Sequence, residues 1–153
     1  MKLGVICDGI SRDLAHSLNV MDEFGLEYAE LQFVGDKEVG DHSKTEIKEI
    51  DTLLRDRGKP VSCLSRHIFA GMTSQNKPGD ELHLKHMDAL KRVVEMAHIV
   101  GSPFVRIMTQ KKEQILWGFH GAEKWNVAHG AWDSMPPLIE PAVDFARSAG
   151  VKL

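Results

Sequence analysis

Three ionisable side chains stand at matching places in the sequence and could contact a polar substrate. Glu30 lies five residues after Gly25, and Arg106 lies five residues after Gly101, each within an apolar segment that follows its glycine. A carboxylate and a guanidinium at equal heights on alternate strands can bind a substrate or form a buried structural ion pair, and the sequence leaves both interpretations open. His67 ends a third apolar segment, so it is a stronger candidate than the histidines of the predicted helices.

A long segment, residues 109–137, adds aromatic candidates. Connections between a strand and a helix are usually about 2 to 6 residues long, and much longer ones tend to be functional. Aromatic faces and imidazoles could wall a polyol-binding pocket, or a short helix could pack its tryptophans on the rest of the fold. Packing is favoured for Trp132, whereas both possibilities stay open for Trp125. The segment contains Trp117, Phe119, His120, Trp125, His129 and Trp132.

Alternating strands and helices must position these side chains. A glycine repeatedly closes a helical pattern and opens an apolar strand, and Ser43 with Glu46 has the spacing of a capping box. The third predicted helix has the clearest period, with Leu84, Met87, Leu90, Val94 and Ala97 on one face. The predicted strands are 3–7, 27–34, one from residue 61, and 104–108; the predicted helices are 13–24, 43–58, 84–101 and one from 138 to 150.

Strands separated by single helices predict parallel pairing and the α/β class. An open doubly wound sheet usually has a glycine-rich phosphate loop after its first strand, but "CDGISRD" contains no GxGxxG or GxxxxGK pattern. A (β/α)8 TIM barrel is therefore favoured, with residues 1–153 as about its first four βα units in the order 1-2-3-4. Val151 and Leu153 open a fifth strand beside the fourth, which indicates a truncated barrel.

Composition narrows the class of protein further. The chain has 153 residues, 42% of them hydrophobic, and a formal net charge of −3, which suits one domain or part of one. Scattered charges give no basic surface for nucleic acid, and no apolar run is long enough for a membrane span or a signal peptide. We expect a cytoplasmic protein. Cys7 and Cys63 are predicted to be reduced, without a disulfide or structural zinc.

Three stretches resemble the sugar phosphate isomerase/epimerase family, the xylose isomerase-like TIM barrels: "GLEYAELQF", "HLKHMDALKRVVEMAHIVGSPFVRIMTQ" and "LIEPAVDFARSAGVKL". The resemblance implies a divalent metal, Mn, Mg, Co or Zn, that polarises a sugar while carboxylates move a proton between adjacent carbons. It also implies that the metal ligands come from strands five to eight. We therefore expect no metal ligand within this chain and no tightly bound metal.

The resemblance implies few site residues in this part of a barrel. Glu30, His67 and Arg106 match positions near the substrate, Trp125 is added as a candidate for substrate binding, and no catalytic residue is assigned. A second branch of the family, the apurinic endonucleases, takes zinc ligands from histidines that end strands three and four. His67 fits the first, but Met108 and its successors supply no second histidine, so this metal hydrolase is the less favoured alternative.

A third possibility is a half barrel that binds or assembles without catalysis. Open sheet edges favour aggregation or pairing with another chain. We expect Leu3, Val5, Val61 and Val105, or their neighbours, to be exposed along such edges. Self-association or a homo-oligomer is therefore predicted, with a small sugar or sugar phosphate as ligand and neither nucleic acid nor membrane as partner.

Overall fold

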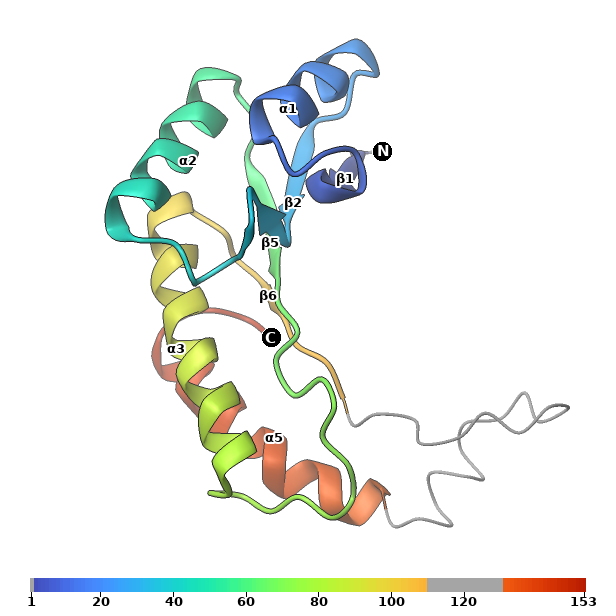
Figure 1. Cartoon of the computed structure of the whole chain (residues 1–153), viewed down its shortest axis with the longest axis vertical. Coiled ribbons are helices and arrows are strands. Elements are labelled where there is room, and N and C mark those ends of the chain that lie inside the picture. The colour runs from blue at the N-terminus through green and yellow to red at the C-terminus, as the bar shows by residue number, and fades with distance from the viewer. Residues whose placement is uncertain (1, 110–130) are drawn as a thin grey trace, which may run out of the picture.

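The computed structural model describes residues 2–109 and 131–153, in which strands and helices alternate (Figure 1). The main sheet contains β1 (Gly4–Ile6), β2 (Tyr28–Leu31), β5 (Val61–Ser65) and β6 (Val105–Arg106). A separate hairpin consists of β3 (Phe33–Val34) and β4 (Lys37–Glu38). The helices are the 3-10 turn η1 (Cys7–Gly9), α1 (Leu14–Glu23), α2 (Lys44–Asp56), α3 (Glu81–Val100) and α5 (Ala131–Ser148).

The strands of the main sheet are all parallel and lie in the spatial order β1-β2-β5-β6. After α5 the chain returns to this sheet, where Lys152 pairs in parallel with Phe104 at the start of β6. The predicted strand order is thus confirmed, including the position of the segment at Val151 beside the fourth predicted strand. In a doubly wound sheet the strand order would reverse instead.

The pairing of β2 with β5 contains a bulge. Ala29 pairs with Val61, but the next residue, Glu30, pairs with Cys63, so Ser62 is an extra residue on β5. Side chains alternate between the two faces of a strand. The extra residue therefore keeps Val61 on the face of Ala29 and places Cys63 on the face of Glu30.

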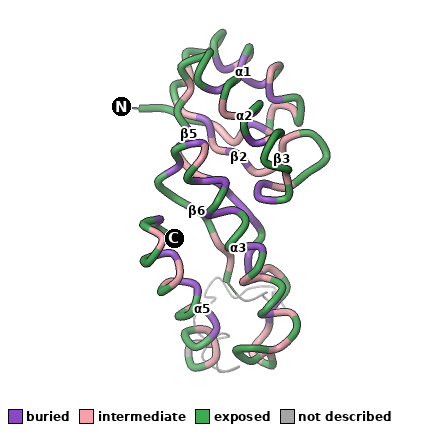
Figure 2. Tube along the Cα trace, turned by 90° about the vertical axis from the view of Figure 1, so that its left-hand side faces the viewer, coloured by how far each residue is buried: buried purple, intermediate pink, exposed green. Residues whose placement is uncertain are grey.

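Helices cover one face of the main sheet. Leu31, Leu64 and Val105 are buried on that face, whereas Glu30 and Cys63 are only half buried on the opposite one, which we call the inner face. Buried stretches follow the strands and one side of the helices in Figure 2. No helix in the described ranges is long and apolar enough to cross a membrane.

Side-chain caps begin three of the helices. The predicted capping box is present at the start of α2, where the backbone N–H of Glu46 donates to Ser43 Oγ at 3.3 Å and the N–H of Ser43 donates to Glu46 Oε2 at 2.7 Å. Asp13 and Asp80 accept a backbone N–H in the first turns of α1 and α3. At the end of α3, Gly101 adopts a φ of 70°, which glycine tolerates best.

The predicted strand 27–34 is too long. β2 stops at Leu31, and β3 then turns back against β4 through Gly35, whose φ is 61°. This left-handed conformation suits glycine, which has no Cβ to clash with the backbone. In a continuous strand, alternation would place Phe33 on the same face as Leu31, toward the helices, but Phe33 instead lies half buried under the guanidinium of Arg12.

Two predicted helices also need correction. Leu84 is 54% exposed, because the buried face of α3 is formed by Leu90, Val94 and other residues farther along. The last helix begins at Ala131, before Pro137, and continues through its prolines. Proline lacks the N–H that a helix interior uses, so the sequence indicated a loop there.

The expected exposure along open strands is found only in part. Leu3 is exposed and Val5 is half buried, but Val61 and Val105 are buried. Both of these valines lie on the face that the helices cover, so an open edge does not expose them.

Candidate functional site

The hairpin of β3 and β4 connects loops at the carboxyl ends of the strands. At its turn, the N–H of Gly35 donates to the C=O of Arg12 at 2.8 Å, in the loop that precedes α1. The N–H of Phe33 donates to Asp8 Oδ1 at 3.4 Å, and Glu38 on β4 contacts the residue that follows β5 by two positions. This short element therefore fixes the ends of three neighbouring strands relative to one another.

His67 lies between Glu38 and Gln32. Glu38 Oε1 accepts the backbone N–H of His67 at 2.9 Å and lies 2.7 Å from His67 Nδ1. The amide nitrogen of Gln32 lies 3.0 Å from His67 Nε2. Since an ionised carboxylate only accepts hydrogen bonds, Nδ1 carries the ring proton and Nε2 accepts from the Gln32 amide. The tautomer of His67 with the proton on Nδ1 is thus favoured. The His67 side chain is 45% exposed.

Arg66 fixes the hairpin to the rest of the fold. Its buried side chain donates to the C=O of Val39 and to Asp41 Oδ2, the latter at 2.7 Å, and its Nε lies 3.7 Å from Glu38 Oε2. Asp41 also pairs with Arg92 at 3.0 Å. Burial alone would raise the pKa of Asp41, but the hydrogen bonds from Arg66 and Arg92 lower it below its usual value. Glu38, the acceptor that orients His67, is therefore held in place by Arg66, which Asp41 holds in turn.

The inner face of the sheet carries a second polar group. The hydroxyl of Ser65 donates to Glu30 Oε1, and Ser65 is in register with Arg106 on β6. No carboxylate within residues 2–109 and 131–153 lies at ion-pair distance from Arg106. The structural ion pair between Glu30 and Arg106 is therefore not formed, because Glu30 bonds to the intervening strand instead.

The two cysteines are free thiols. Cys7 lies in η1 rather than in the predicted strand, and burial, with a further contribution from the Asp8 charge, raises the pKa of its thiol to about 12. Burial also raises the pKa of Cys63, against an opposing hydrogen bond with Ser65. Both thiols stay protonated near neutral pH, so neither is an activated nucleophile.

The predicted site residues fall in two places. Glu30 and Arg106 lie on the inner face, at the level of Ser65, and His67 lies beyond the carboxyl end of β5. Trp125 lies outside the described residues, as does the side chain of Trp132. Contact of any of these side chains with a substrate stays a prediction.

Sequence reasoning missed Glu38, Arg66 and the role of Phe33. A signal for the first of these exists, because Gly35 and Asp36 form a pair typical of a two-residue hairpin loop. The strand prediction through residue 34 concealed it. No comparable local signal marks Arg66, whose partners come from a segment about 25 residues away.

The described residues do not supply a metal site. In the ranges that the structure describes, no three His, Cys, Asp or Glu side chains lie close enough together to hold a metal ion. The best donors are already engaged, since His67 bonds to Glu38 and Glu30 bonds to Ser65. This donor set does not fit the divalent metal that the family resemblance implies.

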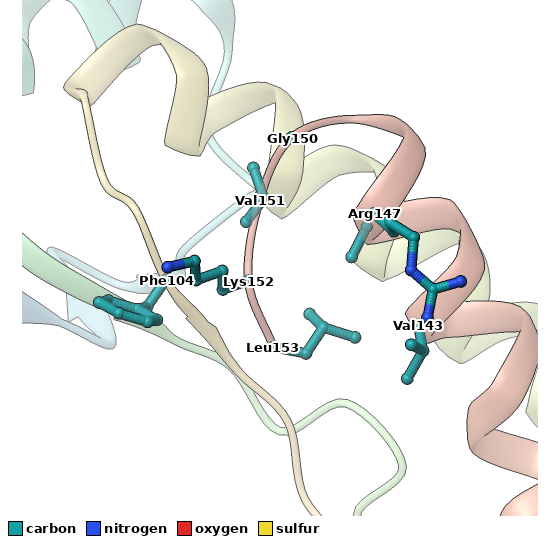
Figure 3. A pocket seen from close by; sticks show the side chains of 8 residues that line it. Phe104, Val143, Arg147, Gly150, Val151, Lys152 and Leu153 are labelled. Atoms are coloured by element: carbon teal, nitrogen blue, oxygen red, sulfur yellow. The ribbon is translucent and has the colours of Figure 1, made fainter.

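A groove of about 510 Å³ lies elsewhere, between the end of α5 and the start of β6. Figure 3 shows Phe104 on one side, Val143 on the other, and Val151 with Leu153 between them. Because Phe104 precedes β6, this mainly apolar groove is at the opposite end of the strand from His67 and does not belong to the candidate site.

Comparison with known proteins shows likeness only at the level of structure. No protein-family model matches the chain, and no curated protein does either. A candidate xylose isomerase from Rhodospirillum rubrum superposes with a TM-score of 0.63 at 19% identity, over 99% of this chain and 52% of its own. A xylose isomerase-like TIM barrel protein from Mycobacterium smegmatis, solved with magnesium, gives 0.56 at 19% identity, over 90% of this chain and 44% of its own.

A sugar phosphate isomerase/epimerase from Parabacteroides distasonis also superposes with a TM-score of 0.56, at 16% identity, over 98% of this chain and 49% of its own. The chain thus spans about half the length of the solved structures that it matches. The parallel order β1-β2-β5-β6 agrees with successive units of such a barrel. The chain has the fold of the xylose isomerase-like TIM barrels and corresponds to about half of one.

Proposed function

We propose that the chain forms the substrate-binding part of a sugar or sugar phosphate isomerase or epimerase, and that it is one portion of a complete barrel. The observation that carries this proposal is the position of His67, oriented by Glu38 and Gln32 at the carboxyl ends of β2 and β5. In TIM barrels the active site lies at this end of the strands. The likeness to solved isomerase and epimerase barrels supports the reaction class.

The polar groups at this end suit a ligand rich in hydroxyl groups. His67 Nε2 can accept a hydrogen bond from a hydroxyl when the Gln32 amide moves aside, and that amide can then donate to a neighbouring oxygen. Deeper on the inner face, Glu30 uses one carboxylate oxygen for Ser65 and has a second that can accept from a substrate. These residues bind and orient the sugar; we assign none of them to proton transfer at carbon.

The family resemblance implies a divalent metal that would polarise the carbonyl and hydroxyl of the substrate. Because the resemblance implies ligands from strands five to eight, we propose that the ligands belong to barrel strands outside these 153 residues. The chain alone should then bind Mn²⁺ weakly, as calorimetric titration can measure. Micromolar binding that disappears in His67→Ala would show that the metal site has been misplaced.

The sugar-binding proposal can be tested by titrating D-xylulose into the isotopically labelled 153-residue chain and following backbone amide signals by NMR. We expect saturable shifts at Gln32, Glu38 and His67. Replacing His67 by Asn should weaken binding at least about fivefold, in line with the loss of one hydrogen bond. His98→Asn, in an exposed part of α3, is the matched control and should leave binding unchanged. Absence of saturable shifts, or equal binding by both variants, would contradict the proposal.

A further inference from the structure

Two arginines differ from all the others in this chain. The sequence contains seven arginines, and each lies in a described segment. Arg12 and Arg106 have no carboxylate partner at ion-pair distance among the described residues. The remaining five all have such partners: Arg55 with Asp51, Arg57 with Asp22, Arg66 and Arg92 with Asp41, and Arg147 with Asp144.

Arg12 and His67 both lie near the same aromatic ring, that of Phe33. Its guanidinium carbon lies 4.7 Å from the centroid of the Phe33 ring, and the centroids of the Phe33 and His67 rings are 6.3 Å apart. The backbone of Arg12 is fixed as well, because its C=O accepts the N–H of Gly35. Arg12, Phe33 and His67 therefore form one group at the carboxyl ends of β1, β2 and β5, which we call the rim row.

Arg106 adds a second cation at the carboxyl end of β6. Its neighbour Val105 is buried on the helix-covered face, so alternation places Arg106 on the inner face, where it is exposed. Three acidic side chains on this side already accept hydrogen bonds: Glu38 from His67, Glu30 from Ser65, and Asp8 from the N–H of Phe33 at 3.4 Å. The two arginines without a carboxylate partner among the described residues thus both lie at the carboxyl ends of the strands, where the sugar site is proposed.

We propose that this site selects an anionic sugar, and that Arg12 binds its phosphate or carboxylate group while His67 and Gln32 bind hydroxyl groups. The inference rests on the proposed function and adds the charge of the substrate to it. A guanidinium stacked on an aromatic ring keeps its N–H groups free in its own plane, where they can donate in pairs to a phosphate or carboxylate. A neutral sugar would leave this charge without an anionic partner.

The test compares four probes on the labelled 153-residue chain: D-fructose, D-fructose 6-phosphate, D-gluconate and inorganic phosphate. We expect at least one anionic sugar to bind about tenfold more tightly than D-fructose, with shifts at the amides of Arg12 and Phe33. Arg12→Gln should abolish this preference. Arg55→Gln, which removes an exposed arginine paired with Asp51 on α2, is the matched control and should preserve it.

The outcomes separate the two proposals. Preference for D-fructose 6-phosphate alone assigns the phosphate, and preference for D-gluconate alone assigns the carboxylate; either supports the inference. Equal binding of neutral and anionic sugars, or a preference that survives in Arg12→Gln, overturns the inference and leaves the sugar site intact. Binding of inorganic phosphate at Arg12 without binding of any sugar supports the anion site and overturns the proposed function. An unchanged thermal transition in Arg12→Gln checks that the variant folds.

Discussion

Around β2 and β5, the chain is held by side chains that come from several elements, whereas in the described ranges β6 is attached mainly through backbone pairing. The hairpin bonds to the loop after η1, to the end of β5 and, through Asp41, to Arg92 on α3. At the other side, β6 is two residues long, and a bridge between Phe104 and Lys152 joins the end of the chain to it. The buried Leu138 of α5 contributes a C=O that lies 2.9 Å from Nε2 of His83 on α3.

This difference indicates that side chains near the hairpin can hold a ligand in a fixed geometry, whereas those on β6 cannot. Orienting an imidazole requires partners that are themselves fixed, and Glu38 is fixed by its strand and by Arg66. Arg106, on β6, has no such support from side chains in the described segments. We therefore expect the rim row and Gln32 to dominate ligand binding, while Arg106 adds a charge without a fixed geometry.

The largest effect on the region around β2, β5 and the hairpin is expected for Gly40→Ala. Gly40 has a φ of 89°, and a Cβ built there would lie 2.8 Å from the backbone N of Val93 on α3. The contact is between two backbone segments, that of Gly40 and that of α3, and neither can shift without disturbing its packing. We therefore expect the free energy of unfolding to fall by about 3 to 5 kcal/mol. Urea denaturation measures it.

Gly35→Ala is the control, because Gly35 also has a positive φ but open space around it. It should cost only about 1 kcal/mol. Equal losses in the two variants would mean that the close approach to α3 does not hold the hairpin.

A smaller loss is expected for Arg66→Met, which keeps much of the buried volume but removes the charge. The C=O of Val39 would lose its donor, and Glu38 would lose a nearby cation, at a cost of about 2 to 3 kcal/mol. Arg92→Met removes the exposed partner of the same Asp41 and should cost about 0.5 kcal/mol or less. If the two variants are equally stable in urea, the buried arginine is not the anchor of the hairpin.

A weaker effect depends on pH. Burial lowers the pKa of His86, whose ring lies 5.7 Å from that of Phe69, although a hydrogen bond with Ala70 opposes this. Below about pH 6.5, His86 binds a proton more readily in the unfolded chain than in the folded one. The free energy of unfolding should therefore fall as the pH drops from about 7 to 5. His86→Gln should reduce this slope in urea titrations, and His98→Gln should not. A slope that is the same in both variants would rule out His86 as its source.

The smallest effect on stability, but a distinct effect on association, is expected at the edge of the sheet formed by β6 and the end of the chain. Phe104 and Leu153 are 45% and 39% exposed beside the apolar groove, and a second copy of the chain could cover them. Phe104→Ser should therefore shift sedimentation toward a smaller species with little change in unfolding. Leu84→Ser, at an exposed leucine of α3 away from this edge, is the control. A wild-type chain that stays monomeric across a tenfold dilution would contradict self-association.

The sequence allowed the strand order to be predicted because glycines and helical periods are local signals. The capping box at Ser43 is another local signal, and it was found. The failures involve tertiary contacts. Phe33 leaves the sheet because its hairpin bonds to loops distant in sequence, and Leu84 is exposed although Leu90 and Val94, predicted on the same face of α3, are buried. His67 could be predicted as a candidate from its place after a strand, but its partner Glu38 could not, since their pairing depends on the fold of the hairpin.

The bulge at Ser62 has a consequence for how the length of this chain could vary. Elsewhere in the sheet, losing one residue would turn every following side chain to the opposite face. At Ser62 the surplus residue is already outside the regular pairing, and its hydroxyl donates to the C=O of Ala29 at 3.1 Å. Deletion of this one residue would leave Cys63, Ser65 and the approach to His67 on their present faces. A natural variant shortened at this position could therefore keep the same binding residues.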